Sequence, residues 1–85
     1  MRTVAFHAEA FEDFTRWAQD DPSMFQRIAR MLGECAREPF KGIGKPEPLK
    51  NQLRGYWSRR LGDQHRLVYK VTQDSIIVAS CKYHY

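Results

Sequence analysis

The spacing of apolar residues changes twice along this 85-residue chain, and those changes constrain the fold more than any other feature. Strand-like alternation gives way to helical spacing near residue 8, and strand-like segments return at residue 56. Apolar side chains recur at helical spacing in residues 8–20 and again in residues 22–37. Between these stretches, Asp21 can accept the free N–H groups of a helix start, and Pro22 is tolerated in a first helical turn. We therefore expect two consecutive amphipathic helices with these bounds.

Strand-like segments flank the two helices. Residues 2–7 alternate apolar and polar side chains, which favours a short strand with one buried face. Short turns separate three further segments rich in β-branched and aromatic residues, which lie at 56–61, 65–71 and 75–82. Such short turns favour an antiparallel meander. The sequence thus predicts an α+β fold in the order β-α-α-β-β-β, a single small domain over residues 1–85 whose antiparallel sheet carries both helices on one face.

The end of the chain combines a strong strand signal with chemically active side chains. Residues 75–82 are apolar and β-branched enough for the middle of a sheet, so we expect this strand to hold the terminus in place. Tyr83, His84 and Tyr85 follow it directly. An imidazole at the end of a rigid strand becomes a group with a defined position, which favours a functional interpretation over a polar strand end.

The connection between the helices and the meander, residues 38–55, lacks helical or strand periodicity. Glycines and prolines interrupt it at five positions before Gly55 closes it: Pro39, Gly42, Gly44, Pro46 and Pro48. A structureless connection of this length is uncommon in so small a domain unless it is functional. The segment is basic at its centre, and Glu47 lies there between two prolines that restrict its backbone.

Several classes of protein are disfavoured by composition. No stretch approaches the roughly 18 apolar residues of a membrane span, and the N-terminus lacks a secretory signal, so we expect a cytoplasmic protein without membrane contact. Cys35 and Cys81 are far apart, which favours buried reduced thiols. His7, His65 and His84 show no metal-ligand spacing, and we expect neither metal nor cofactor.

The net charge of +4 is unevenly distributed. Residues 1–40 carry five basic and seven acidic side chains, a net charge of −2, whereas residues 41–85 carry nine basic and three acidic ones, a net charge of +6. A cationic surface of this kind attracts polyanions such as nucleic acid but confers no sequence preference. Charge alone is equally compatible with a basic domain that binds no nucleic acid.

Three side chains of the basic half would suffice for metal-free cleavage of RNA by its own 2′-hydroxyl. Glu47 is the candidate base, Arg66 the cation for the phosphate, and His84 the acid for the departing 5′ oxygen. Each also has a structural interpretation: a solvated loop acid, a cross-strand ion-pair residue, and a polar strand end. The aromatic pair that opens the meander either packs on the sheet or stacks on a base; packing is favoured for Trp57, and the question is open for Tyr56.

Five short segments of the chain resemble the YoeB (Txe) toxins of the RelE superfamily: residues 39–40, 44–50 (GKPEPLK), 57–60 (WSRR), 65–69 (HRLVY) and 83–85 (YHY). The resemblance implies a RelE-like, microbial-RNase-like fold. It also implies a metal-independent endoribonuclease that cleaves mRNA in the A site of the 70S ribosome, inhibits translation, and is held inactive by a YefM-like antitoxin.

The resemblance also assigns roles residue by residue. It implies that Glu47 acts as base, that Arg66 stabilises the transition state and that His84 acts as acid. Tyr85 is implicated in orienting the substrate, and the basic pair Lys50 and Arg60 matches positions that contact phosphate. The alternative function is a non-catalytic basic module that binds nucleic acid. The sequence leaves codon preference, and the choice between a monomer and a homodimer, open.

Overall fold

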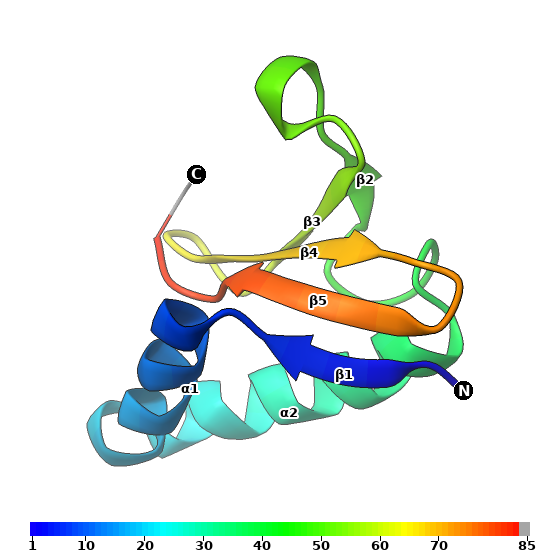
Figure 1. Cartoon of the computed structure of the whole chain (residues 1–85). Coiled ribbons are helices and arrows are strands. Elements are labelled where there is room, and N and C mark those ends of the chain that lie inside the picture. Colours follow the sequence, from blue (N-terminus) through cyan, green and yellow to red (C-terminus); the bar gives the residue numbers. More distant parts are fainter. Residues whose placement is uncertain (84–85) are drawn as a thin grey trace.

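The computed structural model describes residues 1–83 and contains two helices on one face of a five-stranded sheet (Figure 1). The elements in chain order are β1 (Thr3–Phe6), α1 (Ala8–Asp20), α2 (Pro22–Arg37), β2 (Glu47–Pro48), the 3₁₀ turn η1 (Asn51–Leu53), β3 (Tyr56–Arg60), β4 (Arg66–Val71) and β5 (Ser75–Ser80). The predicted α+β class and the predicted order of the main elements are confirmed. The connection that we expected to be irregular contains the short strand β2 and the turn η1.

The sheet has the strand order β1-β5-β4-β3-β2, so β5 lies inside it as predicted. Strands β3, β4 and β5 form the expected antiparallel meander. Strand β1 instead pairs in parallel with β5, with Thr3 opposite Ser75, which makes the sheet mixed rather than antiparallel throughout. A tight turn sets the direction of neighbouring strands only when they are consecutive in the chain, and β1 and β5 are its first and last strands.

The boundary between the helices follows the local signals in the sequence. The Asp21 carboxylate accepts a hydrogen bond from the backbone N–H of Met24 at 3.2 Å, and Pro22 is the first residue of α2. The hydrogen bond to Asp21 satisfies the Met24 N–H, which has no partner within the first turn of the helix. Helix α2 buries five side chains against the sheet: Ile28, Met31, Leu32, Cys35 and Ala36. Helix α1 buries only Ala10 completely and lies at the edge of the core.

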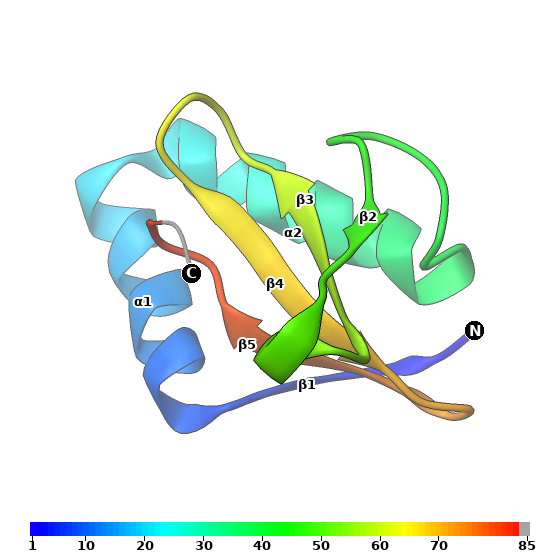
Figure 2. The same cartoon turned by 90° about the horizontal axis from the view of Figure 1, so that it is seen from above.

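The core fills the space between the helices and the sheet (Figures 1 and 2). Both cysteines lie in it, as the sequence predicted. Burial raises the pKa of the Cys81 thiol to about 12, so this group is protonated at neutral pH. The indole of Trp17 donates a hydrogen bond to the Cys81 carbonyl at 3.0 Å, which attaches α1 to the segment that follows β5.

A buried arginine, Arg59 of β3, organises the start of the connection between α2 and β2. Its side chain is fully buried. The guanidinium donates hydrogen bonds to Glu34 Oε1 at 2.9 Å and to three backbone carbonyls, those of Glu38, Lys41 and Ile43. Because its donors satisfy three carbonyls of this short segment, residues 38–43 fold around one cation. No local pattern in the sequence indicates that Arg59, rather than its neighbour Arg60, is the buried arginine.

Tyr69 of β4 completes this buried cluster. Its hydroxyl accepts a hydrogen bond from Arg59 Nε at 3.0 Å and donates one to the Pro39 carbonyl at 2.7 Å. Burial raises the pKa of Tyr69 above its ordinary value, so the phenol stays protonated and can donate. The cluster therefore holds the chain where it leaves α2 and sets the path toward β2, which carries Glu47.

Candidate active site

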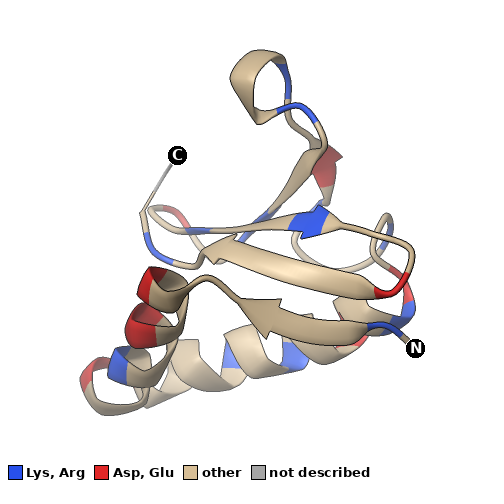
Figure 3. Ribbon diagram, in the orientation of Figure 1, with Lys and Arg blue, Asp and Glu red and all other residues tan. Residues whose placement is uncertain are grey.

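The face of the sheet that the helices leave open carries charged side chains from three neighbouring strands. Successive strand residues point to opposite faces, so Ser58 and Arg60 of β3 share a face opposite to that of the buried Arg59. Arg60 pairs in register with Arg66 of β4. In Figure 3, strand β2 (Glu47–Pro48) carries an acidic residue in red, and basic residues in blue lie on β3, on β4 and in the segment above β2.

Glu47 and Arg66, far apart in the sequence, meet on this face. Glu47 Oε1 lies 3.3 Å from Arg66 Nη1. The carboxylate-bearing side chain is 54% exposed and that of Arg66 is 19% exposed, so both are accessible to a ligand. An exposed pair of this kind contributes about 0–1 kcal/mol to folding. Stability alone is thus a weak reason to place a carboxylate and a guanidinium together here.

Ser58 is a member of this constellation that the sequence did not indicate. It is fully buried, it lies opposite Glu47 in the β2–β3 register, and its hydroxyl accepts a hydrogen bond from Arg66 Nη1 at 3.3 Å. This hydrogen bond helps to hold the Arg66 guanidinium in position on the open face. A serine within a strand carries no charge that would indicate a functional role. The one available signal is its spacing of two residues from Arg60, which predicts that both side chains lie on the same face of the strand.

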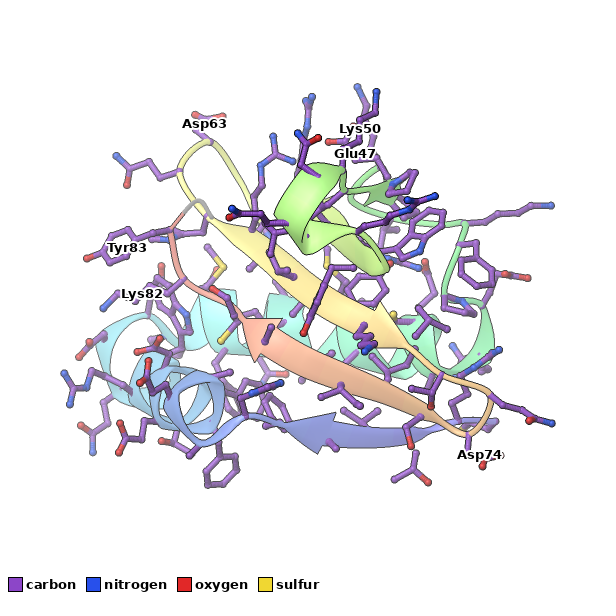
Figure 4. All side chains as sticks on the ribbon, turned by 45° about the horizontal axis from the view of Figure 1, so that its top comes forward. Glu47, Lys50, Asp63, Asp74, Lys82 and Tyr83 are labelled. Atoms are coloured by element: carbon purple, nitrogen blue, oxygen red, sulfur yellow. The ribbon has the colours of Figure 1, made fainter. Side chains whose placement is uncertain are left out.

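Lys50 lies beside Glu47 at the foot of the turn η1, which projects from the open face (Figures 2 and 4). Both residues line one surface hollow, together with Pro48, Leu49, Asn51 and Leu53. A second hollow shares Lys50 and includes Arg54. The amino group and the carboxylate are therefore presented to the same space, although no direct ion pair joins them within the described residues.

The backbone between the buried cluster and β2 requires a glycine at residue 44. Gly44 has φ +80°, and its carbonyl accepts a hydrogen bond from the Arg60 N–H at 2.7 Å. A Cβ atom at this position would lie 2.9 Å from the Arg60 carbonyl oxygen. Only glycine adopts this conformation without steric cost, and its close approach to β3 brings the following residues, including Glu47, alongside that strand.

The two aromatic residues that open β3 lie on opposite faces. Trp57 packs with the core and against Phe40, with ring centroids 4.9 Å apart, so the predicted packing role is confirmed. Tyr56 is half-buried on the open face, where Lys70 Nζ lies 5.9 Å from its ring centroid. Its ring is thus on the same face as Glu47 and Arg66, and its role as a stacking surface stays a prediction.

The chain returns to this region after β5. The strand ends at Ser80, two residues earlier than predicted, and the backbone then bends through Tyr83. The Tyr83 carbonyl accepts a hydrogen bond from the N–H of Arg66 at 3.2 Å. The last described residue therefore lies beside the start of β4. His84 and Tyr85, the predicted acid and substrate-orienting residue, lie outside the described residues.

Residues 1–83 contain no group of three or more histidine, cysteine, aspartate or glutamate side chains arranged to hold a metal ion. In the same part of the chain, no helix has the length and apolar character needed to cross a membrane.

Comparison with known proteins places these observations in a family. Residues 6–85 match the family model described as the YoeB-like toxin of bacterial type II toxin-antitoxin systems. The chain is 50% identical over 82 residues to the toxin YoeB of Streptomyces coelicolor, an alignment that covers 96% of this chain and 98% of the relative.

Two solved structures from Staphylococcus aureus have the same fold and related sequences. The YoeB dimer superposes with a TM-score of 0.90 at 46% identity and covers 99% of this chain and 98% of the other. The YoeB-YefM complex gives a TM-score of 0.90 at 44% identity and covers 100% and 99%. The chain therefore belongs to the YoeB-like toxins of bacterial type II toxin-antitoxin systems.

Proposed function

We propose that this toxin is a ribosome-dependent endoribonuclease that cleaves mRNA in the A site without a metal ion and so inhibits translation in the cytoplasm. The observation that carries the proposal is the contact of Glu47 with Arg66, 3.3 Å apart on an open, basic sheet face. A carboxylate that can accept a proton and a guanidinium that can bind an anion are there presented to the same substrate. That combination suits attack on a phosphodiester.

The chemistry assigns one role to each of three side chains. Glu47 removes the proton of the ribose 2′-hydroxyl, whose oxygen attacks the adjacent phosphorus while the bond from phosphorus to the 5′ oxygen breaks. Arg66 turns from Glu47 toward the phosphate and donates to its non-bridging oxygens, because a guanidinium can present two parallel donors. His84 protonates the departing 5′ oxygen. The products are a 2′,3′-cyclic phosphate and a 5′-hydroxyl.

Three further residues would bind the RNA. Lys50 lines the hollow beside Glu47 and Arg60 lies opposite Arg66, which supports a role for both in contacting phosphates near the scissile one. Tyr85 would orient the substrate, as the family resemblance implies. Lysine and arginine contacts of this type supply affinity that decreases with salt and carries no sequence information. These contacts therefore do not determine base preference.

The S. aureus relatives extend the proposal to partners. One was solved with YefM and another as a dimer, and we propose the same two associations for this chain: a YefM-like antitoxin and a homodimer. An acidic antitoxin that folds on binding would cover the cationic face of the toxin. Residues 1–85 would act in all of these assemblies as a single domain.

The test uses purified toxin, 70S ribosomes programmed with a defined mRNA, and end analysis of the fragments. We expect a 2′,3′-cyclic phosphate and a 5′-hydroxyl, and no cleavage when the nucleotide 5′ to the cut carries a 2′-deoxyribose. The end groups distinguish attack by the 2′-hydroxyl from attack by water, and the assay keeps the Mg²⁺ that the ribosome needs.

Glu47→Gln and His84→Gln serve as the matched loss-of-function variants in this assay. Absence of cleavage by the wild-type toxin, or fragments with a 5′-phosphate, would contradict the proposal. Growth inhibition that is equal for wild type and both variants would instead favour a non-catalytic module that binds nucleic acid.

A further inference from the structure

His65, which precedes Arg66, contacts the backbone of the segment that leads to the end of the chain. Its Nδ1 atom lies 2.8 Å from the backbone nitrogen of Tyr83. The next residue along the chain makes the complementary contact, because the N–H of Arg66 donates to the Tyr83 carbonyl at 3.2 Å. Both backbone polar groups of Tyr83 are thus held by two successive residues at the start of β4.

The direction of the first hydrogen bond determines the state of the imidazole. A backbone N–H can only donate, so Nδ1 of His65 must accept and cannot carry a proton. The ring that makes this contact is therefore neutral, with its proton on Nε2. A doubly protonated ring would place two donors face to face and break the contact.

The held residue has a backbone conformation that needs support. Tyr83 has φ +62°, the left-handed region that non-glycine residues rarely adopt, and its side chain points largely into solvent at 61% exposure. Burial of the Tyr83 side chain therefore cannot account for this conformation. The hydrogen bond that Tyr83 donates to His65 and the one that it accepts from Arg66 oppose this strain.

The imidazole itself is held by aromatic neighbours. Its ring meets the edge of Trp17 at 4.9 Å between centroids and lies 5.3 Å from the ring of Tyr83. Lys82 Nζ lies over both of the other rings, 5.9 Å from the Trp17 centroid and 5.2 Å from that of Tyr83. Helix α1, the residue before β4 and the segment that follows β5 therefore meet in one small aromatic cluster. Figure 4 labels Lys82 and Tyr83 of that segment.

We infer that His65 is a positioning residue for cleavage: its neutral imidazole anchors Tyr83, the residue that directly precedes the proposed general acid, His84. This inference rests on the proposed function. His84 is joined to Tyr83 by a single peptide bond, so an anchor on Tyr83 restricts the space open to its neighbour. The anchor, His65, and the proposed catalytic cation, Arg66, are adjacent residues, so the contacts to Tyr83 and the proposed phosphate site meet at the start of β4.

The inference is tested with His65→Leu and His65→Asn in the ribosome assay. Leucine keeps an apolar contact with Trp17 but removes the acceptor, whereas the asparagine side-chain oxygen can accept from nearly the position of Nδ1. We expect His65→Leu to lower kcat by about 10- to 100-fold with little change in KM, since misplacement of a catalytic group by about 1 Å can cost that much. His65→Asn should retain most of the wild-type kcat.

A readout without RNA separates this inference from the proposed function. In the isolated toxin, nitrogen-15 NMR should show the Nε2–H tautomer of His65, and the Tyr83 amide proton should lose its hydrogen-bonded shift in His65→Leu but not in His65→Asn. His7→Leu is the control, because His7 precedes α1 without a side-chain capping bond. It should leave both the shift and kcat unchanged.

Each outcome bears on the inference. It is overturned if folded His65→Leu cleaves like wild type, if leucine and asparagine reduce kcat equally, or if Nδ1 carries the proton. If the wild-type toxin itself does not cleave ribosome-bound mRNA, the proposed function fails, and the NMR measurements alone decide whether His65 anchors Tyr83. If His65→Leu does not fold, the asparagine variant and the wild-type tautomer decide in the same way.

Discussion

Two arginine–glutamate pairs lie on opposite faces of the same sheet and differ in almost every physical respect. Arg59 is fully buried and reaches Glu34 at 2.9 Å, while its other donors are occupied by backbone carbonyls and Tyr69. Arg66 is 19% exposed, reaches Glu47 at 3.3 Å, and has one further side-chain partner, the Ser58 hydroxyl. The first guanidinium has its hydrogen-bonding capacity used within the fold, whereas the second retains donors for a ligand.

The comparison separates a structural role of arginine, that of Arg59, from the chemical role that we propose for Arg66 in the same small domain. A buried charge must be fully satisfied, and meeting that requirement orders residues 38–43 around Arg59. A partly exposed charge such as that of Arg66 need not be fully hydrogen-bonded within the protein, since water can accept from the donors that the protein leaves free. If the two pairs differ in this way, substitutions in the Arg59–Glu34 pair should change mainly stability, and substitutions in the Arg66–Glu47 pair should change mainly activity.

The largest effect is expected for Glu47→Gln on the open face. Loss of the general base should lower kcat for cleavage on the ribosome by about 10²- to 10⁴-fold. The free energy of unfolding should change by less than about 0.5 kcal/mol, because the pair is exposed. Single-turnover cleavage and urea unfolding measure the two quantities. A large loss of stability would show that the open-face pair is structural and would remove the contrast.

The second effect is expected for Arg59→Met, which should lower the free energy of unfolding by about 3–5 kcal/mol because it leaves buried carbonyls and the Tyr69 hydroxyl without their donor. Urea unfolding measures it. Arg60→Met is the matched control, since the adjacent side chain is exposed on the other face and should change stability by less than about 0.5 kcal/mol. Equal effects of the two substitutions would contradict a structural role specific to Arg59.

A smaller effect is expected at the cations around the site. Lys50→Gln and Arg60→Gln should each weaken binding of a short single-stranded RNA and reduce the slope of log affinity against log salt by about 0.7, the value for one lost phosphate contact. Fluorescence anisotropy at several salt concentrations measures the slope. Arg16→Gln on α1, outside the open face, should leave it unchanged. A slope that changes equally in all three variants would indicate a general charge effect.

The smallest effect concerns pH. The hydrogen bond from the Ile43 N–H and then the Arg59 guanidinium lower the pKa of Glu34 below its ordinary value of 4.5. The unfolded chain therefore takes up this proton first as the pH falls, and the stability that Glu34 contributes is present above about pH 4.5 and is lost as the pH falls through its folded pKa. Urea unfolding between pH 3 and pH 6 should show a shallower dependence in Glu34→Gln. An unchanged slope would contradict this role.

Much of the fold follows from local patterns in the sequence. The capping aspartate and Pro22 predicted the boundary between the helices, and the structure shows Asp21 bonded to Met24 as that signal requires. The meander was predicted from short turns between apolar segments. The parallel pairing of Thr3 with Ser75 was not, because no local turn connects those strands and their direction depends on how the whole chain returns.

Residues of the candidate site were predictable from the sequence where the side chain itself suits the proposed reaction. They were not predictable where their role depends on the tertiary structure. Glu47 and Arg66 stood out as charged groups suited to one reaction, and they meet at 3.3 Å. Ser58 and the contact of His65 with Tyr83 were missed, because each depends on a register or a backbone bend that brings distant residues together. The roles of Glu47, Arg66, His84, Lys50, Arg60 and Tyr85 stay predictions for the experiments above.

The sequence by itself determined the two helices, the four longer strands and the candidate reactive groups, since periodicity, capping and side-chain chemistry are local properties. Only the tertiary structure decided which of the adjacent arginines, Arg59 or Arg60, would be buried, and which strand would neighbour β1. Burial and strand pairing depend on contacts between residues far apart in the chain, and no local pattern records which of those contacts form.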